Sequence, residues 1–402
     1  MSFQFAAITA APADPILGIR QKFLADANPR KVDLSVGVYQ NEKGETPLLE
    51  VVREARQRLL TDDYQAGYLP IDGLPGYNQQ VQKLLFGGDA QILEERRAVT
   101  IQSVGGTSAL RYGADFLRRH YPQAKLFLSD PSWDNHRPIF ERAGFEVGTY
   151  PYYEAHSGGL NFAGMLSALE SMPEGSVVLL HTACHNPTGL DPHARQWQQL
   201  IELFKERRLI AFLDFAYQGF GRGLEEDAFA VRLFAEAGLC FLVASSFSKN
   251  FSLYRRRTGA LTVAAADEEQ AKRVLSQIKT DVRTNNSNPP VDGAAIVNLV
   301  LGDKELRSRW EGELAAMRAR INQMRALLVE KLSQAGLGDR FGHIAGQTGM
   351  FSYSGLTPAQ VERLEKDFGI YALSSGRICV AALNTKNLDY VTEAIVKTAR
   401  QS

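Results

Sequence analysis

The middle of the chain alternates short apolar runs with longer amphipathic segments. The apolar runs predict β-strands at residues 99–104, 125–129, 176–181, 209–214 and 239–245. The segments between them have helical spacing and predict helices at residues 108–119, 135–143, 162–171 and 193–207. Strands that alternate with helices form a parallel or mostly parallel sheet sandwiched by helices. The pattern therefore predicts an α/β fold with a mostly parallel central sheet.

The sequence changes in character after Pro289 and Pro290. Residues 291–329 are rich in Ala, Leu, Glu and Arg and predict a nearly continuous helix with an interruption around Gly302 and Asp303. Downstream, the pattern predicts a strand at 349–355, a helix at 358–368 and a strand at 377–381, which form a smaller α+β unit together with residues 32–39. We expect an N-terminal arm at 1–14, a small domain formed by 15–46 and 317–402, and a large domain at 47–316.

Composition narrows the class of protein. With 402 residues and 45% hydrophobic content, the chain contains enough apolar material for a large core. Its 45 basic residues balance 45 acidic ones, so the overall charge predicts binding neither to nucleic acid nor to an anionic membrane. The N-terminus has no Lys or Arg before Arg20, which argues against a secretory signal. No apolar run approaches the roughly 20 residues of a membrane helix.

Cysteine occurs three times, at Cys184, Cys240 and Cys379, without the spacing of metal ligands. Small buried hydrophobic side chains are the simplest interpretation of all three. We therefore expect no metal site and a reduced, cytoplasmic compartment.

The residues just after the predicted strands are candidates for a ligand site, because ligands in open α/β sheets bind beyond the carboxyl ends of the strands. After the first strand, Gly105 and Gly106 let the backbone approach a ligand. The helix that follows, with the hydroxyls of Thr107 and Ser108 at its start, suits a phosphate. A simple tight turn is the alternative. The segment has neither the GxxxxGK[ST] nor the GxGxxG pattern of nucleotide sites.

Two further strand ends offer groups for a flat ring. Trp133 follows the second strand and could stack on a ring, although loop tryptophans also cover core edges. His136, three residues later, is by itself a structural histidine. Asn186 lies in Asn-Pro-Thr-Gly after the third strand, where its amide could donate to a phenolate-type oxygen or the segment could simply form a turn.

The last two strands end near charged groups. Asp214 ends a strongly apolar strand, where a carboxylate is costly unless it meets a cation or a strong donor. Lys249 comes directly after the apolar run 239–247. Burial lowers the pKa of an amine and makes it available as a nucleophile. For Lys249 alone, a side chain that extends to solvent is the alternative.

Together these residues meet the needs of one cofactor. Pyridoxal 5′-phosphate has an aldehyde that reacts with lysine and a ring nitrogen that stays protonated opposite a carboxylate. It also has a phosphate, an aromatic face and a phenolic oxygen. No other common cofactor uses all five groups, so the sequence predicts a pyridoxal phosphate site.

The chain contains the motifs SFSKNFSLY, HNPTG, DFAYQGFGRGLEEDA, DPSWDNH, SNPP and SGR. As a set they resemble those of the fold-type I, class I pyridoxal-phosphate aminotransferases, in the branch that acts on aspartate and aromatic amino acids. The resemblance runs from Asp14 to the C-terminus. It implies the fold of that family, a homodimer with shared active sites, and transfer of amino groups between amino acids and 2-oxo acids.

The resemblance implies a role for individual residues. Lys249 would form the Schiff base with the cofactor and act as general base, Asp214 would pair with the pyridine nitrogen, and Tyr217 would bond the phenolic oxygen. Other cofactor contacts would come from Gly105, Gly106, Thr107, Trp133, His136, Asn186, Ser246, Ser248 and Arg257, and from Tyr68 of the partner subunit. Substrate contacts would come from Arg377 at the α-carboxylate, Arg283 of the partner subunit at a distal carboxylate, and Asn186, Trp133, Gly37 and Phe351.

Three positions depart from the family pattern. The arginines at 255–257 lack the usual preceding acidic residue, so only the spacing from Lys249 selects Arg257 as the phosphate ligand. Asn286 replaces a common tyrosine, and Gly67 replaces a polar residue. These departures leave two alternatives: an enzyme for aromatic amino acids and aspartate with 2-oxoglutarate, or a dedicated aspartate aminotransferase. From another class, a non-catalytic nucleotide-binding α/β protein is the alternative.

Overall fold

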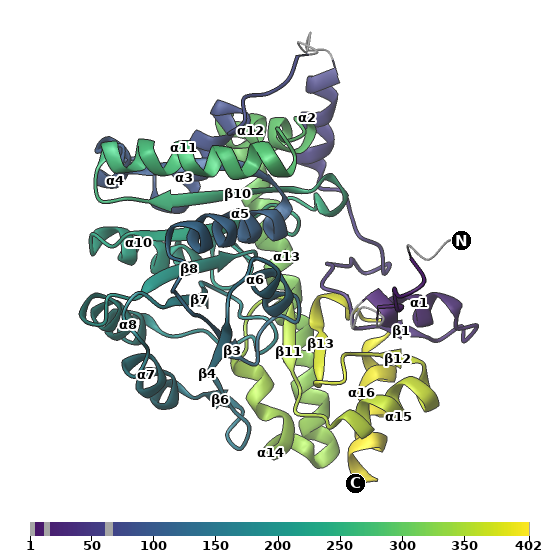
Figure 1. The fold of residues 1–402 in the computed structure, drawn as a ribbon. Helices are drawn as coiled ribbons and strands as arrows, with labels where there is room; N and C mark the ends of the chain where they lie inside the picture. The colour runs from purple at the N-terminus through teal and green to yellow at the C-terminus, as the bar shows by residue number, and fades with distance from the viewer. Residues whose placement is uncertain (1–4, 12–16, 61–66, 402) are drawn as a thin grey trace.

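The computed structural model describes residues 5–11, 17–60 and 67–401. Its largest element is a seven-stranded sheet in the order β2-β10-β9-β8-β7-β3-β4 (Figure 1). The strands are β2 (Ala98–Val104), β3 (Leu126–Asp130), β4 (Val147–Pro151), β7 (Val177–His181), β8 (Ile210–Phe215), β9 (Phe241–Ser246) and β10 (Thr258–Ala264). Only β10 runs antiparallel to its neighbours in this sheet. The predicted α/β fold with a mostly parallel sheet is confirmed.

The five predicted strands correspond to β2, β3, β7, β8 and β9. β7 is Val-Val-Leu-Leu-His, and each of its residues is buried. A strand covered on both faces favours a continuous apolar run, which is why the sequence reveals it. The sequence does not predict β4 or β10. Because the parallel strands share one direction, their carboxyl ends meet at one edge of the sheet, and the start of β10 lies at the same edge.

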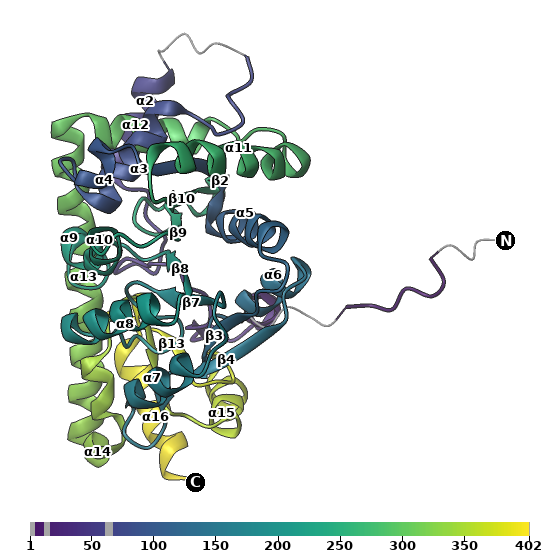
Figure 2. The ribbon, with the colours of Figure 1, turned by 60° about the vertical axis from the view of Figure 1, so that its left-hand side comes forward.

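Helices cover both faces of the sheet (Figure 2). On one face lie α5 (Gly105–His120), α6 (His136–Arg142) and α11 (Glu268–Asn285). On the other lie α3 (Pro75–Phe86), α7 (Phe162–Glu170), α8 (Ala194–Glu206) and α10 (Phe229–Glu236). Each face has its own apolar cluster: Leu110 and Phe140 belong to the first, Trp197 and Phe234 to the second. The four predicted helices correspond to α5, α6, α7 and α8.

The predicted long helix is confirmed as two consecutive helices, α12 (Asp292–Gly302) and α13 (Lys304–Leu332). The interruption is at Asp303, whose carboxylate accepts hydrogen bonds from the backbone N–H groups of Glu305 (2.9 Å) and Leu306 (3.1 Å). This N-cap satisfies donors that have no partner inside the helix and so fixes where α13 begins. α13 then runs from α2 (Glu50–Leu60) toward the C-terminal elements (Figure 1).

The C-terminal elements form a smaller unit beside the sheet (Figure 1). Its strands are β11 (Phe351–Tyr353), β12 (Ile370–Tyr371) and β13 (Arg377–Cys379), and its helices are α14 (Gly338–Phe341), α15 (Pro358–Phe368) and α16 (Leu388–Arg400). β1 (Val32–Asp33), which follows α1 (Leu17–Ala25), pairs in parallel with β12. The predicted addition of residues 32–39 to this unit is thus confirmed by pairing.

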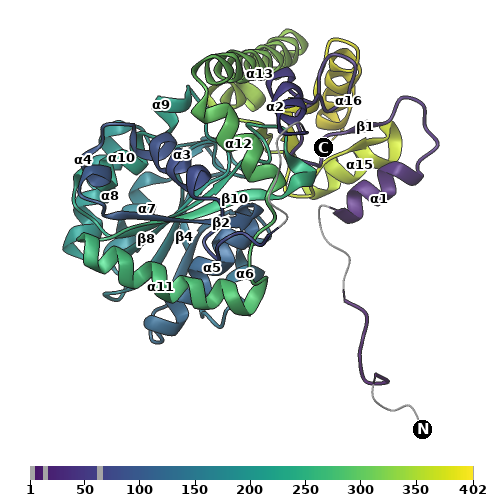
Figure 3. The same cartoon turned by 90° about the horizontal axis from the view of Figure 1, so that it is seen from above.

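The predicted domain limits stay predictions. The limit between residues 316 and 317 falls inside the continuous helix α13, and the predicted arm at 1–14 lies partly outside the described residues. Residues 5–11 lie away from the rest of the chain, with Phe5 and Ile8 exposed (Figures 2 and 3). The remaining short elements are α4 (Gln91–Glu94), β5 (Tyr153–Glu154), β6 (Gly159–Leu160) and α9 (Leu224–Asp227). Within the described ranges, we find no helix that combines the length and apolarity of a membrane span.

Candidate active site

A cavity of about 210 Å³ lies at the carboxyl edge of the sheet, near the start of α5 and the ends of β8 and β9. Most predicted site residues line it: Gly37, Gly106, Thr107, Trp133, Asn186, Asp214, Tyr217, Ser246, Ser248, Lys249, Arg257, Phe351 and Arg377. It is also lined by residues that the sequence does not predict, namely Leu110, His181, Ala216 and Tyr254. Some of these residues were predicted because they follow strands and others because of the family resemblance. The structure places both sets in one cavity.

One end of the cavity is suited to an anion. α5 begins at Gly105, and the first N–H groups of a helix have no partner within it. Gly105 has a φ of +79°, which glycine adopts readily, and its backbone lies against the Arg257 guanidinium. Thr107, Ser246 and Ser248 line the same cavity and add hydroxyl groups. This combination of donors and positive charge fits a phosphate.

Arg257 lies at this end because it immediately precedes β10, the antiparallel strand. Its Nη1 donates to Ser248 Oγ (3.2 Å) and to the Tyr254 carbonyl (3.0 Å). Its backbone is left-handed (φ 50°, ψ 61°), a conformation that costs a non-glycine residue on the order of 1–3 kcal/mol and that clusters at functional sites. Arg256 instead forms an ion pair with a surface carboxylate, and Arg255 does not line the cavity. Of the three arginines, Arg257 is therefore the phosphate candidate.

A chain of hydrogen bonds holds Asp214 at the middle of the cavity. His136 Nε2 donates to Asp214 Oδ2 (2.8 Å), and the Ser132 hydroxyl donates to His136 Nδ1 (2.9 Å). Both Asp214 and His136 are buried. Burial raises the pKa of the Asp214 carboxyl, but the hydrogen bond from His136 and the charge of nearby Lys249 outweigh this effect and leave the pKa below its ordinary value. Asp214 is therefore an anion at neutral pH.

His181 is a site residue that the sequence analysis misses. It is the last residue of β7, and its ring centroid lies 5.1 Å from that of His136. Burial lowers the pKa of His181 to about 3, so the ring is neutral. The ligand atoms of His136, His181 and Asp214 lie within 4.8 Å of one another, a spacing that also suits a metal ion. Two of the candidate ligand atoms, His136 Nε2 and Asp214 Oδ2, are already joined to each other by a hydrogen bond. The sequence signal that could have identified His181 is its position as a histidine at the end of an apolar strand.

Lys249 is half-buried and follows β9. Its Nζ lies 4.5 Å from the centroid of the Tyr217 ring. Burial lowers the pKa of this amine to about 8, an effect that Asp214 opposes and that Arg257 and Arg377 reinforce. A neutral amine is the form that acts as nucleophile or base, and it is populated near neutral pH at this pKa.

Arg377 lies at the other end of the cavity and is only 2% exposed. Its Nη1 donates to Asn186 Oδ1 (3.0 Å), its Nη2 donates to the Ser35 carbonyl, and its guanidinium carbon lies 4.1 Å from the Phe351 ring centroid. Gly37 leaves room for that ring, because a Cβ there would lie 2.5 Å from Phe351 Cζ. Among the described residues, the buried Nε of Arg377 has no hydrogen-bond partner. An unpaired buried donor on a cation fits a carboxylate ligand.

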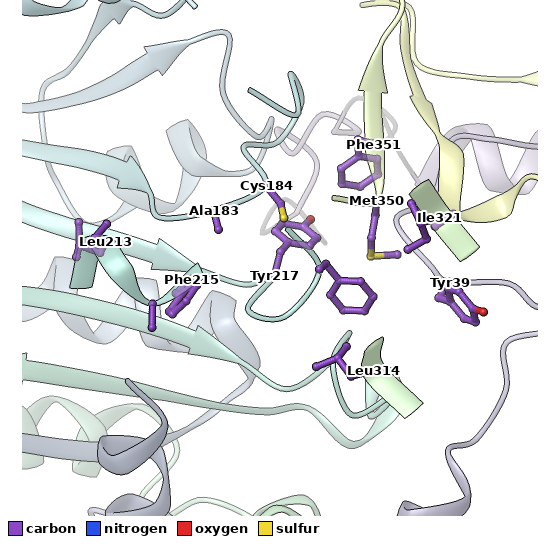
Figure 4. Packing of buried hydrophobic residues seen from close by; sticks show 14 of the residues in the cluster. Tyr39, Ala183, Cys184, Leu213, Phe215, Tyr217, Leu314, Ile321, Met350 and Phe351 are labelled. Atoms are coloured by element: carbon purple, nitrogen blue, oxygen red, sulfur yellow. The ribbon is translucent and has the colours of Figure 1, made fainter. Parts of the chain in front are cut away.

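Apolar side chains from the sheet and from the C-terminal unit pack together in this region (Figure 4). Phe351 and Met350 extend from the β11 segment toward Tyr217 and Cys184. The Tyr217 and Phe351 rings meet edge to face with centroids 5.9 Å apart. Burial raises the pKa of the Tyr217 hydroxyl, so this group stays protonated and can donate a hydrogen bond.

Four predicted residues do not line the cavity. Gly105 and His136 lie behind it and contact Arg257 and Asp214, as described above. Tyr68 and Arg283, by contrast, are exposed. The predicted action of these two from the partner subunit stays a prediction.

Comparison with known proteins places this geometry in a family. A model of the family "aminotransferase class I and II" matches residues 29–395. The chain belongs to this family. The aminotransferase is 53% identical to an aspartate aminotransferase of Pseudomonas aeruginosa, covering 98% of this chain and 99% of the relative. It is 49% identical to the aromatic-amino-acid aminotransferase of Escherichia coli, covering 97% and 98%.

Solved structures agree with this family. The aminotransferase superposes on the crystal structure of an aromatic-amino-acid aminotransferase from Burkholderia pseudomallei, covalently bound to pyridoxal phosphate, with a TM-score of 0.96. The two chains are 56% identical, and the match covers 99% of this chain and 100% of the other. The predicted family and fold type are confirmed, and the alternative of a non-catalytic nucleotide-binding protein is wrong.

Proposed function

We propose that this enzyme exchanges amino groups between 2-oxoglutarate and both aromatic amino acids and aspartate, with pyridoxal phosphate as cofactor. The observation that supports this most directly is the presence of Lys249, Asp214 and Arg377 in one cavity. An amine, an anion and a buried carboxylate-binding cation are what a transaminase needs from its protein. Relatives named for aspartate, for tyrosine and for aromatic amino acids, at 47–53% identity, support the dual specificity.

The cavity supplies a partner for each part of the cofactor. When bound, pyridoxal phosphate supplies an aldehyde that combines with amines and a ring that accepts electrons from the substrate carbon. Its phosphate would be held by the start of α5 and by Thr107, Ser246, Ser248 and Arg257. Asp214 would face the ring nitrogen and Trp133 the flat face. Because Asn186 Oδ1 accepts from Arg377, its Nδ2 is free to donate to the phenolic oxygen together with the Tyr217 hydroxyl.

Lys249 is the acid–base group of this proposal. Its amine would hold the cofactor aldehyde in the resting enzyme, and the amino group of an incoming amino acid would replace it there and leave Nζ as a free base. Nζ could then accept the proton of the substrate α-carbon and donate it again later in the reaction. The lowered pKa of Lys249 favours this role because the amine releases its proton near neutral pH. Asp214, kept anionic by His136, supplies the fixed negative charge.

Arg377 would bind the α-carboxylate that all amino-acid substrates share. Its guanidinium is held by Asn186 and Ser35, and its Nε–H remains without a partner among the described residues. A planar guanidinium can bind a carboxylate through two parallel hydrogen bonds, which a lysine cannot do. This contact would orient the α-carbon toward Lys249, and the buried setting would exclude water.

We propose a homodimer with shared active sites as the functional unit. In this arrangement, Tyr68 of the partner subunit would bind the cofactor phosphate, and Arg283 of the partner subunit would bind the distal carboxylate of aspartate or 2-oxoglutarate. The exposure of both side chains in one protomer, and of Phe5 and Ile8 near the N-terminus, supports this arrangement. We also propose the domain division at 1–14, 15–46 with 317–402, and 47–316, and a cytoplasmic location.

A dedicated aspartate aminotransferase is the second candidate function. Its support is Arg283, which would favour a dicarboxylate, and the name of the Pseudomonas relative. The two functions differ in the treatment of an uncharged ring. Relative kcat/KM for tyrosine, phenylalanine and aspartate, each with 2-oxoglutarate, separates them, and negligible turnover of the aromatic substrates would leave the aspartate function alone.

The cofactor assignment has a separate test. Purified enzyme should absorb visible light, and its absorption spectrum should change when an amino acid is added without an oxo acid. Reduction with borohydride should fix the cofactor to one peptide, the one containing Lys249, as mass spectrometry would reveal. A colourless enzyme that stays unmodified after incubation with pyridoxal phosphate and borohydride would refute the proposed chemistry.

A further inference from the structure

A second cavity, distinct from the active site, has an unusual set of charges. It has a volume of about 470 Å³ and lies between α13, the segment around Gly221 and the turn before β11. Its lining, as far as the described residues go, includes three arginines, Arg222, Arg318 and Arg325, and no carboxylate. We call it the arginine cavity.

None of these three arginines forms an ion pair with another described residue, whereas many other arginines of the chain do. Arg325 is only 2% exposed. Neutral groups surround it: its guanidinium donates to the Gly349 carbonyl, Asn322 Oδ1 (2.9 Å) and Ser352 Oγ (3.3 Å). Burying a cation without an anion is costly, and the burial lowers the pKa of Arg325 to about 10.

Two carboxylates that line an adjoining cavity already accept hydrogen bonds from other donors. Asp227 accepts the backbone N–H groups of Gly219, Gly221 and Arg222. Asp191 accepts the backbone N–H groups of Cys184 and His185, which follow β7, and the Thr348 hydroxyl. Both line the neighbouring cavity that Arg222 also touches, along with Glu226. These three carboxylates partly offset the charge of Arg222. Arg318 and Arg325 line the arginine cavity, whose described lining residues include no carboxylate.

We propose that the arginine cavity is a binding site for a small oxyanion, such as phosphate or a dicarboxylate. Guanidinium groups form strong, charge-assisted hydrogen bonds with such anions. Asn322, Gln347 and Thr348 line the same cavity and add neutral polar groups. The volume is large enough for a small polyatomic anion with bound water. An anion here would supply the missing counter-charge for the buried Arg325.

The position of the cavity gives the site contact with the catalytic region. Thr348 donates its backbone N–H to the Gly189 carbonyl, three residues after Asn186. Arg325 donates to the Phe351 carbonyl, and the Phe351 ring packs against Arg377. A bound anion would therefore touch the segment that supports the proposed substrate arginine.

The chain provides a matched comparison. A third cavity, of about 450 Å³, lies between α7 and α8 and contains one arginine, Arg195, with Glu170, Glu202 and Glu206. The lining of this third cavity is mostly acidic, whereas the lining of the arginine cavity is basic. The two cavities have similar volumes. Anions should avoid this cavity. Arg195 and the exposed Arg142 form no ion pair with described residues, so replacing both removes the same charge as replacing Arg222 and Arg318.

The test is calorimetric titration of the cofactor-loaded enzyme with inorganic phosphate and, separately, with succinate. Ionic strength is held constant with sodium chloride. The wild type, the double variant Arg222→Gln/Arg318→Gln and the control Arg142→Gln/Arg195→Gln are compared. For at least one anion, we expect a saturable site in the wild type and control whose affinity falls at least tenfold in the double variant, because charge-assisted hydrogen bonds are lost. Binding of succinate at Arg377 is present in all three proteins and is subtracted by the comparison.

Each outcome is informative. A site for phosphate alone identifies a phosphate site, and a site for succinate alone identifies a dicarboxylate site; both support the proposal. Equal affinity in wild type and double variant, or no saturable site for either anion, overturns it. If the double variant is misfolded by circular dichroism, crystals of the wild-type enzyme soaked in selenate decide: anomalous scattering in the arginine cavity supports the site, and its absence there overturns it.

Discussion

The proposed active-site residues fall into two groups with opposite surroundings. Lys249, Asp214 and Arg377 line a cavity, and neighbouring side chains fix their positions or shift their pKa values. Tyr68 and Arg283 lie on the surface, and Tyr68 is 94% exposed. The first group is assembled by the fold of one chain. The second group could act only if another surface covered it, which is the reason for placing it at a dimer interface.

The two groups differ in how firmly their positions are fixed before a ligand binds. Asp214 is held by a histidine that is held in turn by a serine, so the charge is fixed before any ligand arrives. In the part of the chain that the structure describes, no comparable network surrounds Arg283, whose Nη1 donates to the nearby Ser287 hydroxyl. We therefore expect replacements in the first group to affect every substrate, and replacements in the second to affect some substrates only.

The largest effect should follow Lys249→Ala. Both the covalent attachment of the cofactor and the proton transfer at the substrate α-carbon depend on this amine. We expect kcat to fall by about 10⁴-fold or more for aspartate and phenylalanine alike. Single-turnover absorbance after addition of amino acid measures the step directly. The control is Lys43→Ala, a replacement at an exposed lysine, which should leave kcat unchanged. Turnover near the wild-type level in Lys249→Ala would remove the basis of the mechanism.

The next largest effect should follow Arg377→Lys. This replacement keeps the positive charge and removes the planar fork that binds a carboxylate through two hydrogen bonds. We expect kcat/KM to fall about 100-fold, equally for aspartate and for phenylalanine, since both present the same α-carboxylate. Thermal unfolding of the variant checks that the buried site has stayed intact. A loss confined to aspartate would instead place Arg377 at the distal carboxylate.

A smaller and selective effect should follow Arg283→Gln. We expect kcat/KM for aspartate to fall by roughly 10- to 100-fold through loss of a charge-assisted pair, while that for phenylalanine changes little. The ratio of the two kcat/KM values is the measurement. A parallel loss for both substrates would mean that Arg283 has a general role, in conflict with its separation from the protomer's cavity.

Mixing variants tests whether Arg283 acts across the dimer. In a hybrid of Lys249→Ala and Arg283→Gln subunits, one of the two sites would have both residues intact only if Arg283 comes from the partner. Random reassociation of equal amounts should then restore about a quarter of the wild-type activity with aspartate, because half of the dimers are hybrids with one good site. No recovery in verified hybrids would place Arg283 in its own subunit's site.

The sequence predicts the sheet well where strands are buried on both faces, and less well elsewhere. β4 contains a glycine and ends at Pro151, and it lies at the sheet edge, so it lacks a long apolar run. β10 is built from small residues and runs opposite to its neighbours, a direction that local sequence does not specify. The predicted interruption of the long helix was recoverable because Asp303 is a standard capping residue.

The site divides in the same way. Lys249, Asp214 and Asn186 could be found because each lies at or just beyond a strand end, where the fold class puts ligands. Arg377 came from family resemblance, since its place beside Asn186 depends on how the C-terminal unit packs. Ser35 was missed because its contact with Arg377 depends on long-range packing, which includes the pairing of β1 with β12. Tyr254 was missed although it lies close to Lys249 in the sequence. His181 was missed because it ends a strand whose apolar run suggested structure alone.

The smallest expected effect concerns the Lys249 amine in cofactor-free protein. Burial lowers its pKa from 10.5 to about 8, so the folded state binds this proton less tightly than the unfolded chain. The folded state is therefore penalised below about pH 8, and the penalty disappears as the pH rises to about 10.5. The variant Lys249→Met has no such proton, so the free energy of unfolding of the wild type should increase relative to the variant over this range. Urea unfolding at a series of pH values measures the difference, with Lys43→Met as the exposed control. A difference that does not change with pH would mean that the amine is as well solvated in the folded protein as in the unfolded chain, and that the first group owes its reactivity to the cofactor alone.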